Sequence, residues 1–75
     1  MKVNYGGVEL NFSELNEHVM VAQTDLWGTV TVVTQGDWVT WNAQSWIGHG
    51  RDLDGAWLDW MDQRREDAEF QNLDL

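Results

Sequence analysis

The stretch TVTVVTQGDWVTW, residues 29–41, has the pattern of a β-hairpin. Its first arm is rich in β-branched residues, which favour strands, and Gln35-Gly36-Asp37 is typical of a turn. With the turn at this place, one parity of the two arms is apolar and forms a core face: Val30, Val32, Val39, Trp41 and Ala43. We therefore predict a hairpin over residues 27–46.

The first twelve residues, MKVNYGGVELNF, predict a second hairpin. Gly6-Gly7 is a two-residue turn that tolerates positive φ at both positions. Folding there gives one polar face and one apolar face, and the facing apolar pairs are Tyr5 with Val8, Val3 with Leu10, and Met1 with Phe12. We therefore predict a hairpin over residues 1–12.

Residues 13–24 allow two interpretations. Ser13 followed by Glu14 has the pattern of a helix N-cap with an acid in the first turn, which favours a short helix over 13–22. The run Val19-Met20-Val21 is equally compatible with a strand. We favour the helix, and the strand remains the alternative.

The last third of the chain predicts a loop followed by a long helix. Ile-Gly-His-Gly-Arg, residues 47–51, has the composition of a flexible loop. A helix over about 52–70 begins with acids and carries one apolar face: Leu53, Trp57, Trp60, Met61 and Ala68. The expected fold is one α+β domain over residues 1–75, with an antiparallel sheet of two hairpins packed by this helix.

The composition limits the classes of function. The chain has 13 acidic and four basic residues, a net charge of -9, and no cysteine. This charge argues against direct binding to nucleic acid or to an anionic membrane, and favours a basic partner. We find no apolar run of signal-peptide or membrane-spanning length, so we expect a cytoplasmic protein, in the producing cell or in a host cell.

The acids gather on the predicted helix. On a helical wheel, one stripe opposite the tryptophans contains Asp59, Asp62, Glu66 and Glu69, and Asp52 and Asp54 precede it. The stripe spans about 15 Å at 1.5 Å per residue, sparser than a DNA strand with one phosphate per about 3.4 Å. A polar face is ordinary in an amphipathic helix. However, acids at a helix C-terminus oppose its dipole, which favours a role toward a cationic partner.

The six tryptophans divide into two groups. Trp41, Trp57 and Trp60 are expected in the core. Trp27, Trp38 and Trp46 fall on the nominally outer parity of the second hairpin. This outer group is explained by a sheet buried on both faces or by a small separate core. The alternatives are a protein-binding patch, a carbohydrate platform, or a homodimer contact.

Arg64 falls at the centre of the predicted apolar face of the helix. We expect its stem to pack and its head to reach water, with stacking on Trp57 or Trp60 as a variant. The alternative, a functional one, is that Arg64 forms an ion pair with a partner protein at an interface.

The sequence offers no recognisable catalytic or metal-binding motif. His18 and His49 are 31 residues apart and match no zinc spacing. Asp52-Leu53-Asp54-Gly55 is a fragment of a calcium loop that lacks the remaining ligands. We therefore expect no cofactor, no metal and no enzyme activity.

These features favour a small acidic inhibitor that binds a nucleic-acid-binding protein. Its carboxylates would occupy a Lys/Arg-lined groove as a DNA mimic, with the outer tryptophans adding contact. In size and acidity the chain resembles small phage-encoded antagonists of host defence, including anti-CRISPR and anti-restriction proteins. This resemblance is one of composition and assigns no residue a role. The alternative is a structural or adaptor subunit that binds a partner, or itself, through the tryptophan face.

Overall fold

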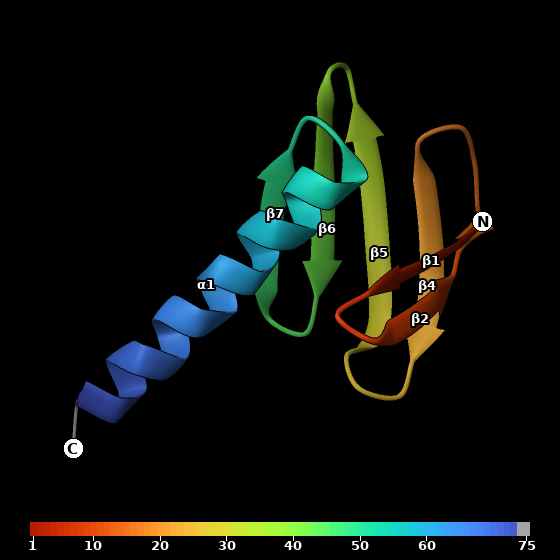
Figure 1. Cartoon of the computed structure of the whole chain (residues 1–75). Coiled ribbons are helices and arrows are strands. Elements are labelled where there is room, and N and C mark those ends of the chain that lie inside the picture. Colours follow the sequence, from red (N-terminus) through yellow and green to blue (C-terminus); the bar gives the residue numbers. More distant parts are fainter. Residues whose placement is uncertain (74–75) are drawn as a thin grey trace.

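The computed structural model describes residues 1–73, including the side chains of residues 1–67. β1 (Lys2–Tyr5) and β2 (Val8–Asn11) form a two-stranded hairpin, and α1 (Leu53–Leu73) follows the last strand (Figure 1). Between them lies an antiparallel five-stranded sheet in sequential order: β3 (Ser13–Glu14), β4 (Val19–Thr24), β5 (Gly28–Gln35), β6 (Trp38–Ala43) and β7 (Trp46–Gly50). The expected small α+β fold is confirmed.

Both predicted hairpins are present. In the first, Val3 pairs with Leu10 and Tyr5 with Val8, and both turn glycines have positive φ. In the second, Val32 pairs with Trp41, which places the predicted core parity of β5 and β6 on one face. Period-two patterning in these segments therefore gave the correct register.

The helix favoured for residues 13–22 is wrong, because this segment forms β3, a loop and β4. Asn16 closes the loop: its Oδ1 accepts hydrogen bonds from the backbone N–H groups of His18 (2.7 Å) and Val19 (3.0 Å). The β-branched Val19 and Val21 then pair with β5. The side-chain turn at Asn16 offers the backbone an alternative to helical hydrogen bonds.

The flexible loop predicted for residues 47–51 is also wrong. Residues 46–50 form β7, which pairs along its length with β6. Gly48 and Gly50 lie under α1, where a Cβ atom on Gly48 would stand 2.3 Å from the backbone nitrogen of Trp60. A Cβ on Gly50 would stand 2.4 Å from the backbone nitrogen of Ala56. These glycines therefore permit the helix backbone to lie directly against the strand.

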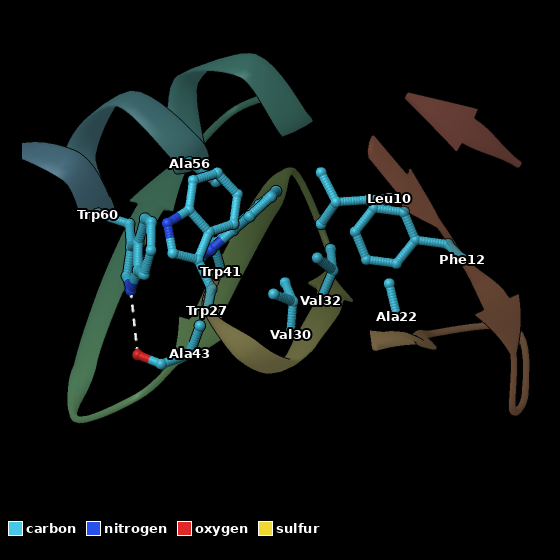
Figure 2. Packing of buried hydrophobic residues seen from close by; sticks show 10 residues of the cluster. All are labelled: Leu10, Phe12, Ala22, Trp27, Val30, Val32, Trp41, Ala43, Ala56 and Trp60. Atoms are coloured by element: carbon cyan, nitrogen blue, oxygen red, sulfur yellow. Dashed lines mark hydrogen bonds between the residues drawn. The ribbon is translucent and has the colours of Figure 1, made fainter. Parts of the chain in front are cut away.

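One face of the five-stranded sheet carries all the covering elements. α1 packs over β6 and β7, and the β1–β2 hairpin packs beside it over the other strands (Figure 1). The buried core between these layers combines residues from both coverings and from the inner sheet face (Figure 2): Leu10, Phe12, Ala22, Trp27, Val30, Val32, Trp41, Ala43, Ala56 and Trp60.

Trp41 is the centre of this core and is fully buried. Its ring meets those of Tyr5 and Phe12 edge-on, at centroid distances of 5.6 and 6.1 Å, and lies 5.8 Å from that of Trp60. Trp60 donates an Nε1–H hydrogen bond of 3.1 Å to the Ala43 carbonyl (Figure 2). Aromatic contacts thus join the hairpin, the sheet and the helix around one indole.

The close approach of α1 to β7 predicts that Gly48→Ala strongly destabilises the fold. The added Cβ meets backbone atoms that cannot move alone, so we expect a loss of about 3 kcal/mol in unfolding free energy. Gly36→Ala is the matched control, since its added Cβ meets nothing within 4 Å. It should lose only about 1–2 kcal/mol from its positive φ. Denaturant unfolding followed by tryptophan fluorescence measures both, and equal losses would contradict the packing argument.

Candidate partner-binding surfaces

Three of the predicted partner-binding acids make hydrogen bonds within the chain. Asp52 accepts one at 2.7 Å from the backbone N–H of Gly55, and so caps the start of α1. Asp54 accepts a hydrogen bond from the hydroxyl of Tyr5. Asp59 accepts one at 2.8 Å from the backbone N–H of His49 in the edge strand β7. Asp54 thus connects the helix to the hairpin, and Asp59 connects it to the sheet.

Asp62 and Glu66 point away from the sheet and are exposed. Neither has a hydrogen bond or ion pair with any residue that the structure describes. We call the surface around them the exposed helix side, formed by Asp54, Leu58, Asp62, Arg65 and Glu66. The side chains of Glu69 and Ala68, which the sequence placed on the stripe and in the core, lie outside the described residues.

Few cations of the chain neutralise these acids. Among residues 1–67, the one ion pair within 4 Å joins Lys2 to Glu9, at 3.8 Å, and both side chains are largely exposed. Arg51 instead lies over the ring of Trp38, 5.7 Å from its centroid. The carboxylates of the exposed helix side therefore lack a cationic partner in the described part of the chain.

Arg64 lies over aromatic rings. Its guanidinium is 4.8 Å from the ring centroid of Trp60 and 5.8 Å from that of Trp46. The guanidinium thus follows the variant expectation of stacking on Trp60, in place of a head that extends into water. The second ring is Trp46, which the sequence did not indicate. Asp67 accepts a hydrogen bond from the Nε1–H of Trp46. Arg64 and Asp67 thus hold Trp46 against the helix.

The three outer tryptophans of the sequence prediction have different environments. Trp27 is buried, and its ring meets those of Trp41 and Trp60 edge-on. Trp46 pairs with Ala43, so it lies on the inner parity and is half-buried. The common outer face predicted for these residues is therefore wrong for Trp27 and Trp46. Trp38 alone of the three is exposed there, at 53%.

The face of the five-stranded sheet opposite α1 is uncovered by any described element. We call it the outer sheet face. It is defined by the strand registers: Ser13, Val19, Val21, Gln23, Thr29, Thr31, Val33, Gln35, Trp38, Thr40, Asn42, Ile47 and His49. One row across the sheet runs from Val21 through Thr31 and Asn42 to Ile47. The face is a continuous, mostly neutral surface of valine, threonine and amide side chains.

Two exposed apolar residues on these surfaces were missed by the sequence analysis. Leu58 lies on the exposed helix side, one turn from both Asp54 and Asp62, and is 56% exposed. On a helical wheel, Leu58 falls on the side opposite the tryptophans that face the core. Ile47 is 47% exposed on the outer sheet face. Its position could be found only after residues 46–50 were recognised as a strand.

The described residues contain no group of three or more His, Asp or Glu side chains arranged to hold a metal ion. Within the same part of the chain, no helix is long and apolar enough to cross a membrane. Comparisons with protein-family models, curated proteins and solved structures gave no match.

Tyr5 predicts a loss of stability at alkaline pH. Burial, followed by the hydrogen bond to Asp54 and the negative charges of Asp54 and Asp52, raises the pKa of its phenol above the ordinary 10.0. The folded state holds this proton more tightly than the unfolded state. The resulting stabilisation is complete below about pH 10 and is lost as pH rises through the pKa of the folded state.

Unfolding free energies measured from neutral to alkaline pH should therefore fall more steeply for the wild type than for Tyr5→Phe. Because Tyr5 is the single tyrosine, its ionisation can be followed by absorbance in the same samples. Parallel profiles for the two proteins would contradict this assignment.

Asp59 predicts a second effect on stability. Asp59→Ala removes the acceptor of the His49 N–H group, whereas Asp62→Ala removes the same charge from an exposed position one turn later. Both variants gain the same helix propensity. We therefore expect Asp59→Ala to be less stable than Asp62→Ala by about 1 kcal/mol. Urea unfolding compares them, and equal midpoints would show that the hydrogen bond contributes nothing.

Proposed function

We propose that this protein is a small acidic inhibitor that binds a nucleic-acid-binding protein and competes with its nucleic acid. The contact is made by the exposed helix side, which enters a groove lined by lysine and arginine. A restriction or CRISPR defence complex of a host cell is the kind of target that the compositional resemblance favours. In that case the protein acts in the host cytoplasm and needs no catalytic group.

The observation that carries this proposal is the lack of internal neutralisation. Asp62 and Glu66 are exposed, and neither forms an ion pair within 4 Å in the described part of the chain, although Arg65 lies on the same helix side. The guanidinium of Arg64 lies over aromatic rings instead. On the exposed helix side three acids stand against one cation, Arg65, whereas a surface that serves only solubility usually mixes the two signs more evenly. Carboxylates left without a cation are available to a cationic partner, and they also attract it from a distance.

The geometry of α1 also supports such a contact. Asp62 and Glu66 are one turn apart, about 6 Å along the axis, which lets two separate basic side chains reach them. Leu58 stands one turn before Asp62 and can give an apolar contact beside the charges. The C-terminal turns of α1 extend past the sheet, so a groove could close around the helix (Figure 1).

The acids that accept hydrogen bonds within the chain contribute to this surface in a different way. Asp54 and Asp59 accept hydrogen bonds within the chain, and their formal charges add to the attractive field. Their geometry is fixed by Tyr5 and by the strand, and direct contact with a partner falls mainly to Asp62 and Glu66. Glu69 is included in the proposal from its place in the sequence.

Parallel affinity captures from a candidate host lysate test the proposal. The helix variant carries Asp62→Asn, Glu66→Gln and Glu69→Gln. The control variant carries Glu14→Gln, Asp25→Asn and Asp37→Asn, which remove the same charge away from α1. A protein captured by the wild type and the control should bind the helix variant roughly tenfold or more weakly, because three charge contacts are lost. Its binding to the wild type should weaken steeply with salt.

Competition identifies the mechanism. If the captured protein binds nucleic acid, duplex DNA should release it from the wild type. Equal loss of binding in the two triple variants would show that only net charge matters, and would contradict a localised surface. Binding that persists in the helix variant and resists salt would contradict the proposal as a whole.

A second function, an adaptor that binds another protein through the outer sheet face, is favoured by the exposure of Trp38. Trp38→Ala distinguishes the two functions. It should leave capture through α1 unchanged, whereas an adaptor would lose its partner.

A further inference from the structure

The outer sheet face is unusual because it has no carboxylate in a strongly acidic chain. The strands β4 to β7 contain no Asp, Glu, Lys or Arg. Glu14 in β3 pairs with Met20 and so has the inner parity. Lys2 and Glu9 cancel in the hairpin β1–β2, so the net charge of -9 is carried by Glu14, by the loops between strands, and by the region of the chain that contains α1.

The side chains of this face are suited to contact with another flat surface. Trp38 in β6 and Ile47 in β7 are 53% and 47% exposed, and Val19, Val21 and Val33 extend the same face across β4 and β5. A sheet face that only meets water is ordinarily covered by charged side chains of both signs. The remaining positions here carry threonine hydroxyls and amides, which can form hydrogen bonds across an interface.

We infer that a second copy of this chain packs on the outer sheet face, giving a symmetric dimer with two sheets face to face. Sheets pack in this way at a separation of about 10 Å. The charge distribution selects the second copy as the occupant. Two chains of charge -9 repel each other, and this face lets them meet with no carboxylate of either copy in the contact.

The area of the outer sheet face sets the expected stability of the dimer. Strands β4 to β7 cover roughly 400 Å² of flat area in each copy, given strands about 4.8 Å apart and about 20 Å long. Stable dimers bury about 800 Å² of accessible surface per partner, which is about twice the flat area of this face. We therefore expect a weak dimer whose population depends on protein concentration.

Salt gives this dimer a distinctive signature. Screening reduces the repulsion between the two acidic copies and leaves the neutral contact intact. Self-association should therefore increase with salt, which is opposite to the salt dependence expected for binding through the exposed helix side. The two proposals can thus fail independently, since self-association is measured on the protein alone.

Sedimentation equilibrium over a range of protein and salt concentrations tests the inference. The wild type should show a dimer fraction that rises with both. Thr31→Glu places a carboxylate in the central strand of the face and should raise the dimer dissociation constant at least tenfold. Ser45→Glu adds the same charge in the exposed turn between β6 and β7, and should retain the dimer.

Ile47→Ser is a second test that remains valid if Thr31→Glu does not fold. Ile47 is exposed and lies outside the core, so its replacement should leave the fold intact. It should also weaken the dimer while keeping the wild-type fluorescence spectrum. A wild type that stays monomeric at high protein and salt concentration would overturn the inference. So would a dimer that survives Ile47→Ser and a folded Thr31→Glu, or one that Ser45→Glu abolishes.

Discussion

The direct contact of the α1 backbone with the glycine backbone of β7 is the constraint on which the rest of this structure depends. Gly48 and Gly50 leave no side chain between helix and strand. Trp60 can therefore reach across β7 to the Ala43 carbonyl and close the core against Trp41. A helix held one side-chain layer further away would leave this aromatic core open.

The same contact explains why acids recur along the helix. β7 is an edge strand, and an edge strand presents unpaired backbone groups. With α1 so close, Asp59 accepts the hydrogen bond of one such N–H group. Asp54 and Asp67 likewise accept hydrogen bonds from Tyr5 and Trp46. Much of the acidity near the sheet is thus structural, and the carboxylates free of such contacts are those turned away from it.

The sequence correctly predicted the structures that depend on neighbouring residues. It gave the wrong structure where contacts between residues far apart in the chain determine the conformation. The two hairpins followed from period-two patterns around Gly6-Gly7 and Gly36. The glycines of residues 47–51 resembled a loop because their purpose, to admit a helix backbone, appears only when α1 is in place. The strand alternation also gave the wrong face for Trp27. This residue lies in the turn before β5, where the alternation of strand side chains does not apply, and its ring packs against Trp60 in the core.

The placement of the two exposed surfaces links the two proposed interactions. The exposed helix side and the outer sheet face lie on opposite sides of the five-stranded sheet (Figure 1). A dimer formed through the sheets would therefore carry two acidic helices on its outer surfaces, both free to bind. Two linked contacts can give an avidity that exceeds either single affinity by about 10²–10⁴ when the target offers two sites at the right separation. A small acidic chain with one weak binding helix would gain most from this arrangement on a target that is itself an oligomer or that repeats along nucleic acid.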